Sequence, residues 1–345
     1  MRYGFRSFNR QWVIPDLRVI TQPNATLWNS QSDRQVYLTG LSRTAPSSGP
    51  ALTVTALVPD HDHYRGSFNG RVFPLWADSA ATQPNLDPAL LAFLSVAYGR
   101  EVGAEDLFAY IVALVAHPGY VERFEADLAT PGLRIPLTTD AALFAEAATL
   151  GRRIMWLHTF GERMADAADG RPPGPPRLPP GQRPNVPADG AIPSDPDHMP
   201  DSIDHDPTRN RLQVVAGCIE PVPAAVWRYE VSGKQVLTQW FSYRRKTRDR
   251  PLIGDRRPPS PLGDIQPDAW PAEYTTELLN VLNVLGLLVA LEPAQASLLE
   301  RVCSAPLFDT STLLAAGAFA NAAGVQRRAR QAAASESNAR LEGFD

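Results

Sequence analysis

The feature that most constrains the fold is a long proline-rich stretch in the middle of the chain. Residues 165–209 consist mainly of Pro, Gly, Asp and Arg, as in DGRPPGPPRLPPGQRPNVPADG, with few apolar side chains. Such a segment buries too little apolar surface to offset the entropy of ordering it. We therefore predict a flexible insert between two folded parts, residues 1–164 and 210–308, and a helical or disordered tail over 309–345.

The part before the insert changes from strand-like to helical along its length. Short runs rich in β-branched and aromatic residues predict strands over 12–14, 35–39 and 52–58. Asp87 and Pro88 then begin an apolar stripe that Gly99 ends, which is the pattern of a capped helix. Similar stripes predict further helices over 104–118 and 139–157.

Strands and helices are predicted again after the insert. Residues 212–216 and 227–231 read as strands, and residues from Val236 onward fit a helix better. A long apolar helix over 274–291 and a shorter one over 294–302 complete this part. The predicted fold class is α+β: a β-rich N-terminal part with a helical layer, a long disordered proline-rich insert, and a second α/β part with long C-terminal helices.

Composition excludes several classes of protein. The formal net charge of −4 argues against a generally basic nucleic-acid coat, although a basic patch can be local. Cys218 and Cys303 are far apart and lack a CxxC partner, so we expect no disulfide framework or thiolate zinc site, and a cytoplasmic location. The start of the chain has no secretion signal pattern, and the longest apolar run is too short to span a bilayer.

No common catalytic motif is present in the sequence. It contains no GxxxxGK[ST] phosphate loop, no GxGxxG after a strand, no GxSxG elbow, and no Asn/Asp-Pro-Pro-Tyr motif of adenine methyltransferases. We therefore expect no catalytic residue and no enzymatic activity of the chain on its own.

The strongest candidate for a metal site is the stretch PDHDHYRG, which contains Asp60, His61, Asp62 and His63. On an extended segment, the two imidazoles would face the same side and could share a divalent ion. A third ligand at catalytic spacing is missing, so we favour a structural or substrate-contacting turn and expect no metal. A metal-dependent hydrolase centred on these residues stays an alternative.

A basic run follows the predicted helix that begins at Val236. Between Trp240 and Arg257 the chain has seven positive charges and only two acids. Arginine side chains next to aromatic rings suit contacts with phosphates, although a solvated helix end has the same composition. The candidate phosphate contacts are Arg244, Arg245, Lys246, Arg248 and Arg250.

A second cluster of arginines and rings opens the chain. In MRYGFRSFNRQW, Arg2, Arg6 and Arg10 alternate with aromatic side chains, an arrangement that can stack on nucleotides or read base edges. The alternative is a small aromatic core whose arginines reach solvent. We expect this cluster and the one near residue 245 to form one surface that grips duplex DNA.

An ordered series of motifs resembles the C-terminal specificity region of type ISP restriction-modification enzymes and related N6-adenine DNA methyltransferases. The stretches that carry the resemblance are YGFRSFNRQW, QPNATLW, PDHDHYRGSFNGRVFPLW, DLFAYIVALVAHPGYVERFEADL, LGRRIMWLH and WRYEVSGKQVLTQW. The match as a whole runs from residue 3 to about residue 306. In that family the nuclease, the helicase-like motor and the methyltransferase lie upstream. The chain thus resembles the recognition half standing alone, as a split subunit or a fragment.

The resemblance implies a target-recognition domain, or specificity subunit, of a restriction-modification system used in phage defence. Its partners would be double-stranded DNA and an adenine methyltransferase that uses S-adenosylmethionine and flips the base out of the duplex, with a helicase and nuclease in the same system. The chain itself would bind no cofactor and no membrane. From residue chemistry, the base-reading candidates are Arg6, Asn9, Arg10, His61, His63, Arg65 and Asn69. A protein-interaction scaffold that uses the proline-rich insert as a polyproline ligand is a further alternative.

Overall fold

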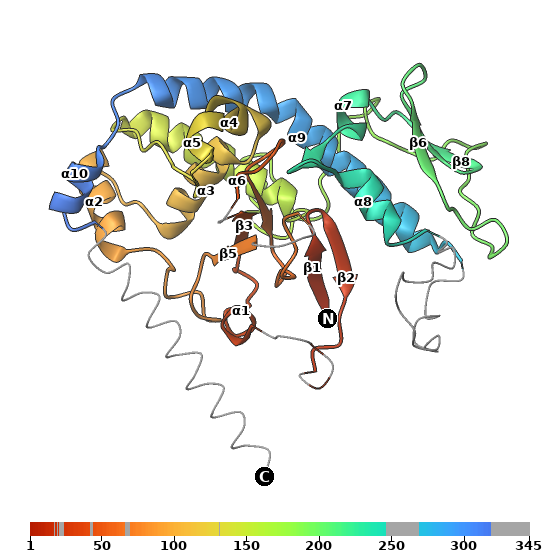
Figure 1. Ribbon diagram of the computed structural model, residues 1–345, viewed down its shortest axis with the longest axis horizontal. Helices are drawn as coiled ribbons and strands as arrows, with labels where there is room; N and C mark the ends of the chain where they lie inside the picture. The colour runs from red at the N-terminus through yellow and green to blue at the C-terminus, as the bar shows by residue number, and fades with distance from the viewer. Residues whose placement is uncertain are drawn as a thin grey trace, which may run out of the picture. The chain divides into compact units, whose positions relative to one another are not determined.

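The structure, a computed structural model, describes residues 1–16, 18, 20, 24–41, 44–65, 70–130, 132–245 and 269–318 (Figure 1). The chain divides into two compact units. Unit 1 comprises Met1–Pro175, Glu230–Gly233 and Leu291–Asp345, and unit 2 comprises Pro176–Tyr229 and Lys234–Ala290. The first boundary, after Pro175, falls inside the predicted insert. Most of the predicted tail lies outside the described residues.

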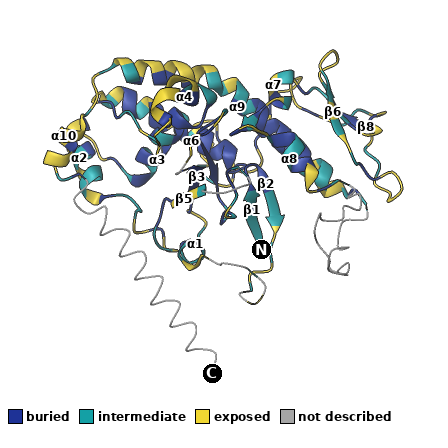
Figure 2. Ribbon diagram, viewed as in Figure 1, coloured by how far each residue is buried: buried dark blue, intermediate teal, exposed yellow. Residues whose placement is uncertain are grey.

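The strands of unit 1 form a hairpin and a small antiparallel sheet. The hairpin pairs β1 (Arg2–Arg6) with β2 (Asn9–Trp12), and the sheet has the order β4-β3-β5. Its strands are β3 (Tyr37–Leu41), β4 (Leu52–Thr55) and β5 (Gly70–Pro74), and the short β9 (Glu230–Val231) also belongs to this unit. All of β3 and β4 is buried, whereas β5 alternates between covered and exposed positions, as expected for an edge strand (Figure 2).

Two helices of unit 1 begin and end where the sequence signals predict. For α2 (Pro88–Tyr98), Asp87 accepts a hydrogen bond from the backbone N–H of Ala89, and Gly99 ends the helix with φ of 62°. Asp140 caps α6 (Ala141–His158) in the same way. The other helices are α1 (Ala25–Asn29), α3 (Ala104–Val115), α4 (Pro118–Arg123), α5 (Glu125–Leu128) and α10 (Thr310–Ala315).

The core of unit 1 lies where α3 and α6 pack side by side (Figure 1). The rings of Tyr110 and Phe144 stack with their centroids 4.8 Å apart. Gly151 allows the two backbones to approach, because a Cβ atom at this position would lie 1.7 Å from the carbonyl oxygen of Ala109. The helical layer predicted from the apolar stripes is therefore confirmed.

The described residues of unit 2 contain a second small sheet, two short helices and the first part of a long helix. The antiparallel sheet has the order β6-β7-β8, with β6 (Ile203–Asp206), β7 (Arg211–Val214) and β8 (Gly217–Ile219). The other elements are α7 (Ala224–Trp227), β10 (Lys234–Gln235) and α8 (Val236–Ser242). The predicted strand over 227–231 is wrong, because α7 ends at Trp227 and only Glu230–Val231 is extended. The helix predicted from Val236 is confirmed.

The long helix α9 (Ala272–Ser304) contributes residues to both units. The sequence predicted two helices, but α9 continues through Pro293, which removes one backbone hydrogen bond without ending the helix. By length and composition α9 could cross a membrane. Its apolar residues are instead core residues of a folded protein: Leu278, Val281, Leu282, Val284, Leu285 and Leu288 are at most 2% exposed.

The proline-rich segment 165–209 has a defined path, so the prediction of a disordered insert is wrong for this part of the fold. Within unit 1, Arg171 is buried and pairs with Asp166 and Asp169. Within unit 2, Asn185 and Glu220 exchange backbone hydrogen bonds of 2.9 Å. Hydrogen bonds from backbone and polar side chains thus replace the apolar burial that the composition cannot supply. The mixed α and β fold class as a whole is confirmed.

Candidate nucleic-acid interface

The N-terminal cluster of arginines and rings folds as the β1–β2 hairpin. Gly4 lies opposite Arg10 and Arg6 opposite Asn9, with a bulge between Gly4 and Arg6. Phe8 occupies the turn with φ of 61° and is buried against the ring of His158, with the centroids 4.9 Å apart. At the other end, the Trp12 ring is 72% exposed and the Arg2 guanidinium lies over it at 5.4 Å. One end of the hairpin is thus core and the other is surface.

The hairpin lies against the PDHDHYRG turn, which the sequence did not connect with it. The backbone N–H of Gly4 donates to the carbonyl of Val58 (3.0 Å), and that of Asp60 donates to the carbonyl of Gly4 (2.7 Å). The Arg6 guanidinium pairs with the Asp60 carboxylate at 2.7 Å. Two groups of predicted DNA-binding residues therefore meet in space, although more than fifty positions separate them in sequence.

Four of the predicted base-reading residues, Arg6, Asn9, Arg10 and His63, line one pocket of about 10 Å³. This volume holds about one water molecule, so the pocket is too small for a base. Asn9 and His63 are 1% and 3% exposed. Arg10 pairs with Glu162 and its guanidinium lies over the Phe160 ring at 4.2 Å. Arg6 and Arg10 are therefore both paired with acids that lie far from them in the sequence.

The two histidines of the turn occupy opposite environments. His63 is buried and its Nδ1 lies 3.0 Å from the Thr39 hydroxyl, whereas the His61 side chain is 75% exposed beside Asp62. The backbone between them is a turn rather than an extended segment, since the N–H of His63 donates to the carbonyl of Asp60. The imidazoles consequently do not share a side. Within the described ranges, no group of three or more His, Cys, Asp or Glu side chains could hold a metal ion.

Burial keeps three histidines of unit 1 neutral and therefore sensitive to acid. It lowers the pKa of His63 to about 3, with the Arg6 charge adding to the effect, the pKa of His158 to about 3, and the pKa of His117 to about 4. The ordinary value of about 6.5 applies in the unfolded chain, which thus binds more protons between pH 6.5 and these lower values. We expect each histidine to reduce the free energy of unfolding by about 1.4 kcal/mol per pH unit as the pH falls through this window.

The pH dependence of unfolding in urea, measured from pH 7 to 5, tests this expectation. His158→Gln should make the decline shallower by about 1.4 kcal/mol per pH unit, whereas His61→Gln, at an exposed position, should leave it unchanged. Glu292 acts in the opposite direction in both proteins, because burial raises its pKa to about 7 and its protonation stabilises the folded state. An identical decline in His158→Gln and the parent protein would contradict the assignment.

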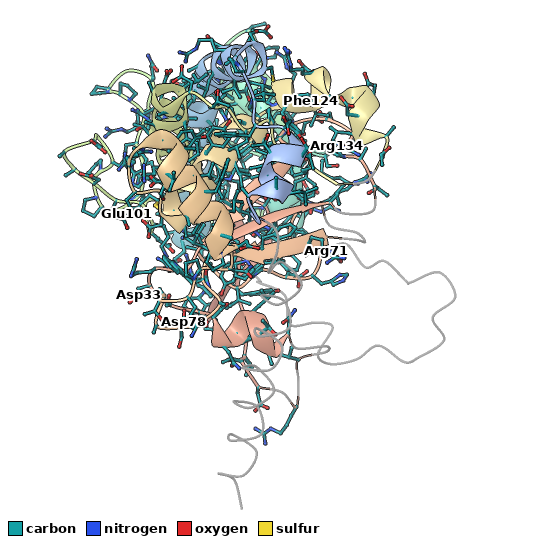
Figure 3. The ribbon with its side chains drawn as sticks, turned by 90° about the vertical axis from the view of Figure 1, so that its left-hand side faces the viewer. Asp33, Arg71, Asp78, Glu101, Phe124 and Arg134 are labelled. Atoms are coloured by element: carbon teal, nitrogen blue, oxygen red, sulfur yellow. The ribbon has the colours of Figure 1, made fainter. Side chains whose placement is uncertain are left out.

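A larger hollow of about 590 Å³ lies beside the sheet of unit 1. Leu27, Val58 and Val72 form an apolar part of its lining, and Leu27 and Val58 belong to one buried cluster. The lining also includes two aromatic side chains, three polar ones suited to a flat, polar-edged ligand such as a nucleobase, and the carboxylate that pairs with Arg6: Tyr3, Trp28, Asn24, His61, Arg71 and Asp60. Figure 3 shows Arg71, which lies on the exposed side of β5. Arg71 could not be predicted as a site residue from the sequence, since a single arginine in a short strand carries no motif.

The second basic cluster begins with a buried arginine. The Arg244 guanidinium is 2% exposed, lies over the Trp240 ring at 3.9 Å, and pairs with the Glu277 carboxylate at 3.0 Å. The Arg244 guanidinium is therefore buried in an ion pair rather than exposed on the surface. Arg245 is partly exposed.

Several predicted contacts are untested by this geometry. Arg65 is partly buried, with its Nε enclosed. Asn69, Lys246, Arg248 and Arg250 lie outside the described residues. The DNA-binding role of all twelve predicted residues stays a prediction.

The match to a known family settles what kind of domain this is. The family described as "Type ISP C-terminal specificity domain" matches residues 1–281 of the 345. The chain belongs to this family. The resemblance inferred from the motif series is thus confirmed. No curated protein matches the chain.

Three solved structures share the fold of this type ISP specificity domain. A nuclease-deletion mutant of the type ISP restriction-modification enzyme LlaGI, in complex with a DNA substrate mimic, aligns with a TM-score of 0.54 and 14% identity, covering 88% of this chain and 24% of that chain. The DrdV–DNA complex aligns with a TM-score of 0.55 and 15% identity, and the alignment covers 87% of this chain and 28% of that chain. The ATP-dependent type ISP restriction-modification enzyme LlaBIII bound to DNA aligns with a TM-score of 0.54 and 12% identity, and the alignment covers 89% of this chain and 18% of that chain. The chain spans less than a third of the length of each of these proteins.

Proposed function

We propose that this chain is the target-recognition module of a type ISP-like restriction-modification or adenine-methyltransferase system. It reads a duplex DNA sequence and presents the target adenine to a methyltransferase, which supplies S-adenosylmethionine and the chemistry. The observation that carries this proposal is the family match over residues 1–281. The three DNA complexes with the same fold support it. The chain would bind no cofactor and act in the cytoplasm, where the DNA is.

The hollow of unit 1 is the surface that we assign to base reading. It combines aromatic faces with polar groups that differ in donor and acceptor character, whereas the small pocket around Arg6 and Asn9 is closed by ion pairs and packing. Base discrimination depends on hydrogen-bonding groups that reach base edges. Among the predicted residues that the structure describes, His61 fits this role best, because its side chain is 75% exposed.

The direct experiment is a duplex selection with the full chain and its methyltransferase partner. We expect enrichment of one asymmetric sequence, and an affinity whose logarithm falls linearly with the logarithm of salt concentration. Methylation of that sequence should require this chain. Absence of duplex binding at about 50 mM salt, where phosphate contacts are strongest, would refute the proposed function.

A matched pair of histidine variants tests the assignment of the hollow. His61→Ala should relax the sequence preference at one base pair by about 1–3 kcal/mol, which is about 5-fold to 150-fold, while the salt dependence stays the same. His198→Ala is the control, because His198 is equally exposed and also lies beside an aspartate, but belongs to unit 2. Unchanged preference in His61→Ala would remove His61 from the reading surface.

The two rival functions have no specific observation in their favour. The metal-dependent hydrolase required His61 and His63 on one side of an extended segment, and they lie in an exposed and a buried environment. For the polyproline scaffold, Pro176 and Pro184 are buried in unit 2 while other prolines of the segment, such as Pro179 and Pro180, are exposed, so burial does not favour this function.

A further inference from the structure

The proline-rich segment contains a rigid loop that presents two arginines. The loop covers residues 177–183, Arg-Leu-Pro-Pro-Gly-Gln-Arg, and we call it the arginine loop. Leu178 anchors it on α9: the backbone N–H of Leu178 donates to Asn283 Oδ1 at 2.8 Å. The Leu178 side chain is 7% exposed and lies over Gly286, where a Cβ atom would be 2.6 Å from Leu178 Cδ1. Fixed backbone angles at the prolines add to the rigidity of the loop.

Both arginines of this loop are held by neutral oxygen atoms. A guanidinium nitrogen of Arg177, Nη1, donates to Asn280 Oδ1, and Arg183 Nε donates to the carbonyl of Leu178 at 3.3 Å. Asn280 is itself 8% exposed, so it positions Arg177 from a buried site. Both arginines are exposed at the surface. Each guanidinium has five N–H donors, so most of them stay available to a ligand.

The charges at this loop are unbalanced. Burial lowers the pKa of Arg177, and the nearby positive charge of Arg183 lowers it further. Among the described residues, no carboxylate lies within ion-pair distance of either one. Three other arginines of unit 2 have acid partners: Arg209 pairs with Asp206, Arg211 with Glu220, and Arg244 with Glu277. Two rigidly held like charges repel each other unless an anion lies between them.

We infer that Arg177 and Arg183 bind a backbone phosphate of the DNA. A phosphodiester has oxygen atoms that can accept hydrogen bonds from both guanidiniums, and its single negative charge relieves their repulsion. This inference rests on the proposed function and adds a phosphate contact that lies outside both predicted clusters. Contacts of this kind fix the register of a protein on the duplex without reading its sequence.

The test compares salt dependence in the full chain with its methyltransferase partner. The double variant Arg177→Gln/Arg183→Gln should bind the selected duplex more weakly, with the slope of log affinity against log salt reduced by about 1, and the same sequence preference. The double variant Arg177→Lys/Arg183→Lys should restore the slope, because lysine carries the same charge as arginine. It should restore only part of the affinity, because lysine lacks the paired N–H donors of a guanidinium. Arg209→Gln is the matched control and should keep the parental slope, because Arg209 has an acid partner.

Three outcomes decide between this inference and its alternatives. A parental slope and affinity in the glutamine double variant, with an unchanged unfolding midpoint, would overturn the assignment of the arginine loop while leaving the proposed function intact. Loss of DNA binding by the parent protein itself would instead refute the proposed function. The third outcome is measured with inorganic phosphate. If phosphate stabilises the parent protein but not the double variant, while both proteins show the same slope of log DNA affinity against log salt, the site binds free phosphate. The assignment of this site to DNA then fails.

Discussion

Replacing Glu277 with Ala should destabilise unit 2 by about 3–5 kcal/mol. The Arg244 guanidinium is 2% exposed, and its Nη2 lies 3.0 Å from the Glu277 carboxylate. The aromatic rings around it, Trp240 at 3.9 Å and Tyr274 at 5.4 Å, offer cation–π attraction but cannot replace the negative charge. Without Glu277, the buried Arg244 guanidinium loses the carboxylate that lies 3.0 Å from its Nη2.

Chemical denaturation, followed by tryptophan fluorescence, measures this effect because Trp240 and Trp270 are both buried beside the ion pair. The double variant Arg244→Met/Glu277→Leu removes both charges and should recover most of the lost free energy of unfolding, since apolar side chains of similar size often replace a buried ion pair at little cost. Glu273→Ala is the control, because Glu273 lies at the exposed start of α9. A loss below about 1 kcal/mol in Glu277→Ala would show that solvent reaches Arg244.

Replacing Gly151 with Ala should destabilise unit 1 by about 3 kcal/mol or more, at or above the upper end of the range for overpacked cores. The added Cβ would lie 1.7 Å from the carbonyl oxygen and 2.4 Å from the carbonyl carbon of Ala109. Both are backbone atoms of α3, so no side-chain rotation relieves the overlap, and α3 and α6 must move apart. The higher helix propensity of Ala, about 1 kcal/mol, offsets only part of this cost.

Thermal or urea unfolding tests the prediction for Gly151. Thr149→Ala, on the exposed side of the same helix, is the matched control and should be neutral or slightly stabilising. Equal stability of Gly151→Ala and the parent protein would mean that α3 and α6 do not approach as closely as the structure indicates.

The sequence by itself determined the local structure and the family. Caps such as Asp87 and Asp140, and apolar stripes at helical spacing, depend on residues a few positions apart, and the structure confirms these helices. The ordered motif series identified the specificity domain family, which the family match confirms. Both kinds of signal are local in the chain, so they can be found without knowing which segments meet.

Only the tertiary structure decided which charges are neutralised and which stay available. Arg6 finds Asp60 across 54 positions and Arg10 finds Glu162 across 152, so charges that look exposed in sequence are paired in space. Arg177 and Arg183 lie in a segment whose composition predicted disorder, yet the fold places the side chains of Asn280 and Asn283 against this loop. No described carboxylate pairs with either arginine, so their charges stay available. Coulomb energy depends on distance in space and on burial, and the order of residues along the chain fixes neither of them.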